Sequence, residues 1–191
     1  MNSRMRSLVI LLMNELCIMG FNIIACFSDR DRGIGLNGGL PWSIKEDMAY
    51  FSRITKATRN PRLRNAVIMG RKTFESMNSK PLPGRLNICV SSTAEPGIEN
   101  NVFFCRALDE AIRLASEHDS IENIFIIGGE SIYRQAIAHP MCDKLYINIV
   151  NGADVPDCDT FFPDIDADIY ELCDDFEVCP SVRGTCYRRR K

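Results

Sequence analysis

Short, nearly continuous runs of apolar residues alternate along the chain with stretches in which apolar residues recur every three or four positions. The near-continuous runs are typical of strands buried on both faces and predict strands over residues 21–27, 65–69, 86–90, 123–127 and 144–150. The periodic stretches predict helices over residues 44–55, 73–77, 108–117 and 131–138. Two more extended pieces are expected near residues 170–178 and 185–188. Strands that alternate with helices indicate an α/β fold with a largely parallel sheet and an antiparallel C-terminal edge.

The helix expected over residues 44–55 carries one departure from this pattern. Its apolar face consists of Ile44, Met48, Phe51 and Thr55, and Asp47 shares that face because of its spacing from Ile44 and Phe51. Burial of a carboxylate is costly without a partner or a function, and it raises the pKa toward the range of proton chemistry. The alternative is an acid at the edge of the stripe that the helix dipole stabilises.

The segment before this helix is rich in glycine. Four glycines occur between residues 33 and 39, and Trp42 is the only tryptophan. Ser43 as the N-cap, with Glu46 three residues later, predicts a capping box at the start of the helix. A glycine-rich loop beside a buried acid is a candidate lid that excludes water, although a plain connector has the same composition.

Two other segments share one design, in which a strand leads into glycine and then into the start of a helix. They are residues 67–73, with Gly70, and residues 125–131, with Gly128 and Gly129. Glycine lets the backbone approach a ligand and a helix start offers free N–H groups, so the pair could hold a pyrophosphate. Each segment alone is equally compatible with a simple turn, and neither has the Gly-x-Gly-x-x-Gly pattern of the doubly wound dinucleotide fold.

Polar side chains follow these strand ends. Arg71 and Lys72 lie at the first helix start, and Ser91, Ser92 and Thr93 follow the next predicted strand. An arginine together with hydroxyl groups suits a ribose 2′-phosphate, which favours NADPH over NADH. The alternative is an ordinary polar loop.

Composition and charge narrow the function classes. The chain has 191 residues, enough for one domain with a real core, and its 46% hydrophobic and 25% charged residues are ordinary for a globular protein. A net charge of −2 gives no basic field for nucleic acid, and we interpret the basic residues 188–191 as a solvated tail. Nine cysteines without a Cys-x-x-Cys pair argue against a metal site. We interpret them as reduced core thiols of a cytoplasmic protein.

Residues 1–19 are interpreted as an N-terminal extension, with the folded domain over residues 20–191. Arg4 and Arg6 precede an apolar run over residues 8–13, which is too short to span a membrane. A disordered tail is the preferred interpretation, and a targeting segment, such as a mitochondrial one, is the alternative.

Taken together, the motifs resemble those of the dihydrofolate reductase family in order and spacing over residues 20–187. The matching stretches are residues 33–42, Asp47 with Phe51, and residues 67–73, 82–85, 126–133 and 159–163. The resemblance implies a monomer with a three-layer α/β fold, a mostly parallel central sheet of about eight strands with an antiparallel C-terminal edge, and about four flanking helices. It also implies NADPH-dependent reduction of dihydrofolate to tetrahydrofolate, in support of one-carbon metabolism and thymidylate synthesis, and binding of antifolates such as methotrexate.

The resemblance implies a role for each site residue. Asp47 would bind the amidine edge of the pterin and favour protonation of its N5, while hydride passes from nicotinamide C4 to pterin C6. Trp42 would close over the nicotinamide, and Arg85, which otherwise suggests a surface arginine, would bind the glutamate tail. The substrate-binding residues would be Ile24, Cys26, Met48, Phe51, Met77, Leu82, Arg85, Ile127 and Tyr133. The cofactor-binding residues would be Gly33, Ile34, Leu40, Gly70, Arg71, Lys72, Thr73, Ser91, Ser92, Gly128, Gly129, Glu130 and Ser131, with a cis peptide between Gly128 and Gly129.

Several positions depart from the family pattern. Asn148 replaces a threonine that is usually hydrogen-bonded to the catalytic acid, Cys26 replaces alanine and Phe74 replaces tryptophan. One extra residue between Ser28 and Gly33 lengthens the lid loop. A pteridine- or riboflavin-pathway reductase is one alternative function, but such relatives generally lack the arrangement seen over residues 40–47. A catalytically inactive folate- or NADPH-binding module, or an RNA-binding regulator, is another, and the near-neutral charge argues against RNA.

Overall fold

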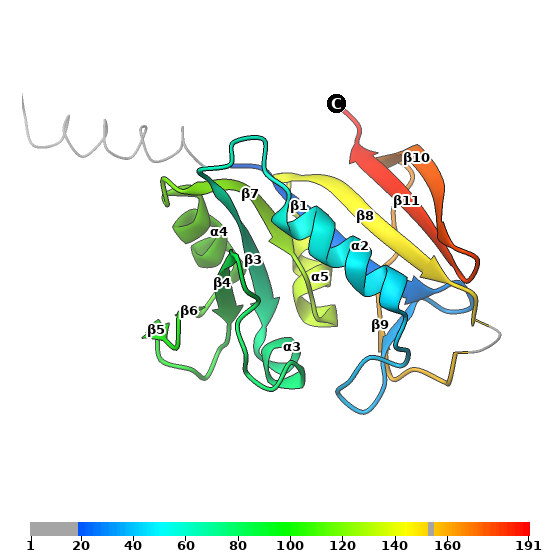
Figure 1. Ribbon diagram of the computed structural model, residues 1–191, viewed down its shortest axis with the longest axis horizontal. Helices are drawn as coiled ribbons and strands as arrows, with labels where there is room; N and C mark the ends of the chain where they lie inside the picture. The colour runs from blue at the N-terminus through cyan, green and yellow to red at the C-terminus, as the bar shows by residue number, and fades with distance from the viewer. Residues whose placement is uncertain (1–18, 153–154) are drawn as a thin grey trace, which may run out of the picture.

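The computed structural model describes residues 19–152 and 155–191 (Figure 1). Its main sheet has nine strands, in the order β10 (Tyr170–Cys179), β11 (Val182–Arg189), β8 (Cys142–Val150), β1 (Phe21–Ser28), β7 (Ile121–Ile126), β3 (Arg64–Gly70), β4 (Arg85–Val90), β6 (Val102–Cys105) and β5 (Gly97–Glu99). A second, two-stranded sheet consists of β2 (Gly33–Gly35) and β9 (Thr160–Phe161). The helices are α2 (Lys45–Lys56), α3 (Arg71–Ser76), α4 (Leu108–Ser116) and α5 (Glu130–Ala138).

The sheet is parallel in its centre and antiparallel at both edges. Strands β8, β1, β7, β3, β4 and β6 pair in parallel, β11 and β10 continue the sheet antiparallel beyond β8, and β5 pairs antiparallel with β6. The α/β class and the antiparallel C-terminal edge are therefore confirmed, and the sheet has nine strands rather than about eight. The four short strands β2, β5, β6 and β9 were not expected from the sequence.

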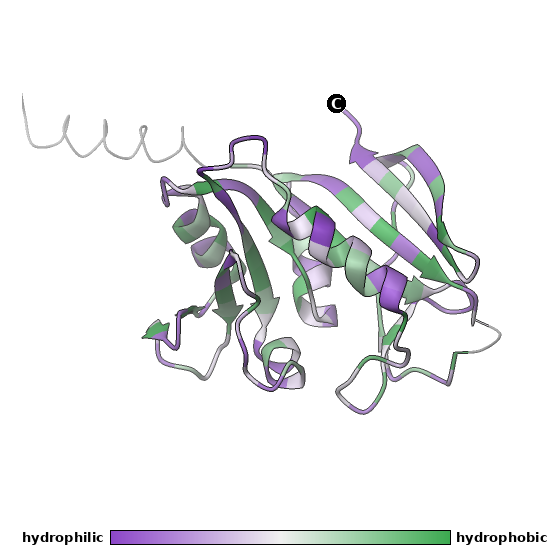
Figure 2. Ribbon diagram, viewed as in Figure 1, coloured by the Kyte–Doolittle hydropathy of each residue, from purple (hydrophilic) through white to green (hydrophobic). Residues whose placement is uncertain are grey.

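Helices cover both faces of the sheet and complete three layers. One core cluster holds the buried residues of α4 and α5 and alternate residues of β1, from Phe21 to Phe27. A second cluster on the other face includes Ile24 of β1, Tyr50 of α2 and Phe74 of α3. Successive residues of β1 thus contact different clusters, as the two-residue period of a strand requires. The edge strand β10 is mostly exposed, and Figure 2 shows hydrophilic residues along β10 and β11.

The start of α2 differs from the predicted capping box. Ile44 is the N-cap, with φ −109° and ψ 114°, and no side chain caps the helix. Ser43 therefore lies one residue before the capping position. The predicted apolar face is also wrong in part, because Met48 is 50% exposed. Asp47, Tyr50 and Thr55 are the buried residues of this helix.

The basic C-terminal run is not a free tail. Arg188 and Arg189 belong to β11. The Arg189 guanidinium donates to the carbonyls of Cys142 and His139, each at 2.9 Å, and lies over the ring of Tyr170. The aliphatic and planar parts of arginine pack well against such surfaces. The predicted extension falls almost entirely on residues 1–18, which lie outside the described residues. Within residues 19–152 and 155–191, no helix has the length and apolar character needed to cross a membrane.

Candidate active site

The centre of the site is a carboxylate buried at the start of α2. Asp47 is only 7% exposed, and the amide Nδ2 of Asn148 donates a hydrogen bond of 2.7 Å to its Oδ1. Burial raises the pKa of Asp47, and the hydrogen bond from Asn148 opposes that rise by favouring the ionised form. The predicted burial of Asp47 is confirmed, and asparagine can reach the acid from the position that threonine usually occupies in the family.

Asn148 lies in the middle of β8, between Cys26 of β1 and Gly184 of β11. A side chain at Gly184 would overlap the ring of Phe176, so glycine is needed there for Phe176 to pack across the strand. Among the described residues, the Asn148 Oδ1 and the Trp42 Nε1 are the buried side-chain N and O atoms without a hydrogen-bond partner. Burying such atoms is costly, and functional sites are where such costs are commonly found.

Cys26 lies beside Asp47 and adds to the polar environment of the acid. Burial, and then the charge of Asp47, raise the pKa of the Cys26 thiol, so the thiol stays protonated. The same side chain packs near Trp42 in a small cluster with Val150. A sulfur where the family usually has a methyl group makes this corner of the site narrower and more polar.

The two glycine segments meet on the neighbouring strands β3 and β7. The Gly70 N–H donates to the Gly128 carbonyl at 2.7 Å, and the peptide between Gly128 and Gly129 is cis. Gly128 has φ +107°, and a Cβ there would lie 2.9 Å from the Tyr133 ring. A Cβ at Gly129 would lie 3.1 Å from the Thr73 hydroxyl. Glycine is therefore required for the two segments to approach, and both expectations, their meeting and the cis peptide, are confirmed.

Tyr133 connects this region to the strand that carries Cys26. It is buried in α5, and its hydroxyl donates to the Ile24 carbonyl at 2.9 Å. The Ile127 N–H donates to the Ile68 carbonyl at 2.9 Å. Met77 and Leu82 pack with Phe51 against the cluster on the α2 face. The cluster on the α2 face thus brings together the predicted pocket residues Ile24, Phe51, Met77, Leu82 and Ile127. Tyr133 belongs instead to the cluster of α4 and α5, and two other predicted binding residues, Met48 and Leu40, are 50% and 62% exposed.

The side chains proposed for the 2′-phosphate lie close together. Arg71 donates to the Thr93 hydroxyl at 2.7 Å and forms an ion pair of 2.7 Å with Glu75. The Thr93 hydroxyl lies 3.3 Å from the Ser91 hydroxyl, and Ser92 is exposed. The structure thus groups the arginine with two of the three hydroxyls, and their role in cofactor binding remains a prediction.

Arg85 is buried, not a surface residue. It is 6% exposed, and its Nη1 donates to the Thr55 hydroxyl at 2.7 Å. Burial lowers the pKa of its guanidinium, which lies over the Phe51 ring at 5.9 Å. In the described part of the chain no carboxylate pairs with Arg85, so the cation can take an anionic group from outside.

Some predicted cofactor residues have evident structural roles. Glu130 pairs with Arg134 at 2.7 Å and accepts a hydrogen bond of 3.4 Å from the Phe161 N–H. Ile34 packs against the core cluster of α4 and α5. Lys72 and Ser131 are exposed at the starts of α3 and α5. Their role in cofactor binding remains a prediction.

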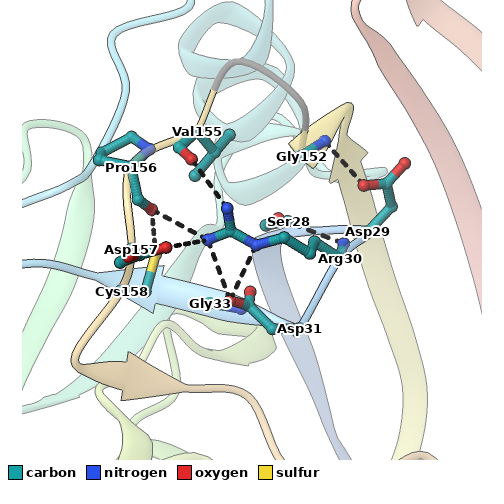
Figure 3. A network of polar contacts seen from close by, with 10 residues as sticks. All are labelled: Ser28, Asp29, Arg30, Asp31, Gly33, Gly152, Val155, Pro156, Asp157 and Cys158. Carbon is teal, nitrogen blue, oxygen red and sulfur yellow. Dashed lines mark hydrogen bonds and ion pairs between the residues drawn. The ribbon is translucent and has the colours of Figure 1, made fainter.

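The turn between β1 and β2 is attached to the segment that follows β8 (Figure 3). Arg30 forms ion pairs of 3.2 Å with Asp31 and Asp157, and it donates to the carbonyls of Val155 and Pro156, each at 3.4 Å. Asp29 accepts a hydrogen bond of 2.7 Å from the Gly152 N–H. This charged turn thus holds the N-terminal end of the glycine-rich segment, and the lid role of that segment remains a prediction.

The parallel sheet, the buried carboxylate and the two adjoining glycine segments define an α/β protein with a candidate active site. Residues 21–179 match the profile of the family described as dihydrofolate reductase. The chain is 41% identical over 164 residues to the dihydrofolate reductase of Drosophila melanogaster, covering 84% of this chain and 88% of that protein. The chain therefore belongs to the dihydrofolate reductase family.

Two other relatives support this assignment. The dihydrofolate reductase of Heliothis virescens is 41% identical over 162 residues, with 82% of this chain and 86% of the relative covered. A bifunctional dihydrofolate reductase-thymidylate synthase of Arabidopsis thaliana is 39% identical over 158 residues, which cover 78% of this chain and 28% of that protein.

Proposed function

We propose that the protein reduces 7,8-dihydrofolate to 5,6,7,8-tetrahydrofolate with NADPH. The observation that carries the proposal is the Asp47 carboxylate, buried between α2 and the sheet and hydrogen-bonded to Asn148 at 2.7 Å. A carboxylate with a second oxygen open to a ligand can accept two parallel hydrogen bonds from the amidine edge of a pterin. Membership of the family and the buried acid together favour catalysis over a binding module.

The rest of the folate molecule has matching surfaces. Phe51, Met77 and Leu82 are partly buried apolar side chains on the α2 face, and in this proposal they contact the pterin and benzoyl rings. Arg85 follows at the far end of α2, through its hydrogen bond to Thr55. Its Nη2 is free of hydrogen bonds to the described residues and can bind the carboxylate of the glutamate tail.

The glycine segments fit a dinucleotide. A Cβ at Gly70, Gly128 or Gly129 would press on Ile132, Tyr133 or Thr73, so glycine allows the close packing around the starts of α3 and α5. In this proposal the cofactor phosphates bind the N–H groups at these two helix starts. Arg71, Ser91 and Thr93 supply one cation and two hydroxyls for a 2′-phosphate. When bound, the nicotinamide supplies a hydride.

In this proposal Asp47 also helps to supply the proton that the reaction consumes. Its raised pKa favours proton uptake at a higher pH than an exposed carboxylate would allow, and in this proposal the glycine-rich loop with Trp42 excludes bulk water. The acid binds the amidine edge and cannot reach N5 directly, so we propose that water carries the proton to N5. The protein residues thus orient the pterin, shield it and keep a proton source close.

The direct test is NADPH oxidation, followed by its absorbance, with and without dihydrofolate. We expect turnover that depends on dihydrofolate and is blocked by methotrexate. Tight binding of both ligands without turnover would instead identify a binding module and refute the proposal. A pteridine or riboflavin precursor as the preferred substrate would identify the other reductase class.

We further propose a monomeric, cytoplasmic protein. The buried cysteines Cys89, Cys105 and Cys142 carry free thiols, as expected in a reducing compartment. Cell fractionation and the mass in solution test these two statements, and an organellar signal would favour the mitochondrial alternative.

A further inference from the structure

Two cysteines oppose each other on the hairpin that forms one edge of the sheet. In the antiparallel pair of β10 and β11, Leu172 is opposite Tyr187 and the next pair is Asp174 with Cys186. Cys173 is therefore the extra residue of a β-bulge, and both Cys173 and Asp174 oppose Cys186. The sequence offered no sign of this pairing, since the two cysteines are separated by a hairpin turn and a third cysteine.

The two thiols are in contact range and differ in exposure. The Cys173 Sγ donates a hydrogen bond of 3.2 Å to the Cys186 carbonyl, and both residues are free cysteines. Cys173 is exposed and Cys186 is half-buried. Burial, and then the hydrogen bond with the Cys173 thiol, raise the pKa of Cys186 to about 12. Cys186 thus keeps its proton, and Cys173 is the thiol that a reagent in solution meets first.

The edge position leaves room for a bond between them. A disulfide requires Cβ atoms roughly 3.5–4.5 Å apart. β10 pairs with β11 on one side only, and the bulge interrupts the ladder at Cys173, so the strand can shift locally to bring the two side chains to that distance.

We propose that low-molecular-weight disulfides modify Cys173, and that Cys173 and Cys186 then form an intramolecular disulfide. The Cys173 thiolate attacks one sulfur of the small disulfide, which breaks its S–S bond and releases one thiol. The Cys186 thiolate, formed as its proton leaves to water, then attacks the Cys173 sulfur and releases the second thiol. The protein loses two protons and two electrons, and the small disulfide is reduced to two thiols.

The bond would strengthen the hairpin and leave the candidate active site intact. Cys186 pairs with Tyr146 on β8, and Phe176 of β10 packs on Tyr50 of α2 at a ring distance of 5.7 Å. A bond between β10 and β11 therefore holds the surface on which the middle of α2 packs. Neither cysteine contacts Asp47 or the glycine segments in any described hydrogen bond, so we expect turnover to be retained. The inference is independent of the proposed reaction.

The test treats the full chain with oxidised glutathione, blocks the remaining thiols with N-ethylmaleimide and maps peptides by mass spectrometry. We expect a Cys173–Cys186 peptide, a rise in melting temperature of at least about 3 °C, and reversal of both by dithiothreitol. Cys179→Ser, which removes the third cysteine of the hairpin, is the matched control and should behave like the wild type.

The two single variants separate the steps. Cys186→Ser should stop at a glutathione adduct on Cys173, and Cys173→Ser should leave Cys186 unmodified for the same exposure time. Should Cys186→Ser fail to fold, Cys173→Ser still removes the pair. A wild-type protein that keeps the glutathione adduct without closing, or that joins either cysteine to a different one, would overturn the proposal.

Discussion

Replacing Asp47 by asparagine separates the chemistry of the carboxylate from its structural role. The amide has nearly the same shape and can still accept the hydrogen bond that Asn148 donates at 2.7 Å. It cannot exchange a proton in the working pH range, and it can offer the pterin edge only one acceptor oxygen. General acid–base catalysis contributes about 10²–10⁴-fold to a rate, which corresponds to roughly 3–5 kcal/mol of transition-state stabilisation. We expect turnover to fall by that factor.

Although Asp47→Asn should lose activity, it should gain stability relative to the wild type, and the gain should depend on pH. Because burial raises the pKa of Asp47, the folded protein holds this proton at pH values where the unfolded chain, with an Asp pKa of about 3.9, has lost it. The wild type therefore loses stability as pH rises through that window. Asp47→Asn should be more stable than the wild type above the window and similar to it below.

Three measurements on Asp47→Asn test the proposed role of the carboxylate. Absorbance at saturating NADPH and dihydrofolate gives turnover, fluorescence titration gives NADPH affinity, and thermal unfolding at acid and neutral pH gives the stability difference. Asp47→Glu, which keeps a carboxylate, is the control and should retain more activity than Asp47→Asn. Turnover of Asp47→Asn within threefold of the wild type would refute the role of the acid, and weakened NADPH binding would mean that the substitution disturbs more than the pterin site.

Three further expectations follow from individual side chains. Arg71→Gln should raise the KM for NADPH by roughly tenfold or more and leave that for NADH nearly unchanged, because the loss concerns the 2′-phosphate; equal effects on both cofactors would contradict this. Arg85→Gln should raise the KM for dihydrofolate about 10- to 100-fold but not that for dihydropteroate, which lacks the glutamate tail; steady-state kinetics with both substrates distinguishes the cases. Arg30→Ala removes the exposed ion pairs to Asp31 and Asp157, and because such pairs contribute little to stability, thermal unfolding should show only a small fall in melting temperature. The same variant should change the rate of product release, which pre-steady-state kinetics measures, because the turn holds the glycine-rich segment; an unchanged release rate would contradict this.

The centre of the fold could be predicted because its strands are buried on both faces. In β3, for example, residues 66–69 are all buried and all apolar, so the run is visible in the sequence. The short strands β5 and β9 lack such a run. β5 has three exposed residues and β9 has only two residues, both half-buried, so neither shows a period. Their pairing depends on tertiary neighbours rather than on a local pattern.

A site residue could be predicted from the sequence where a polar side chain interrupts an apolar pattern, and could not be predicted where its position looks ordinary. Asp47 is recognisable as an acid on an apolar helix face, and the helix indeed buries it. Arg85 carries no such sign, because it begins a strand next to a turn where a surface arginine would be ordinary. Its burial depends on Thr55 and Phe51 of α2, which approach it only in the folded chain. Arg189 was likewise interpreted as part of a solvated tail, because its contacts with Cys142, His139 and Tyr170 form only in the folded chain.

Asn148 illustrates how a residue of the candidate site lowers the stability of the fold. Neighbouring Ile147 is fully buried on one face of β8, while Asn148, 3% exposed, points to Asp47 on the other. Its Nδ2 stabilises the acid, but its Oδ1 is buried without a partner among the described residues, and such an atom costs about 1–3 kcal/mol. An apolar pair at these two positions would remove both costs and would also remove the proton-binding group. The pair is therefore explained by ligand binding and catalysis, not by stability.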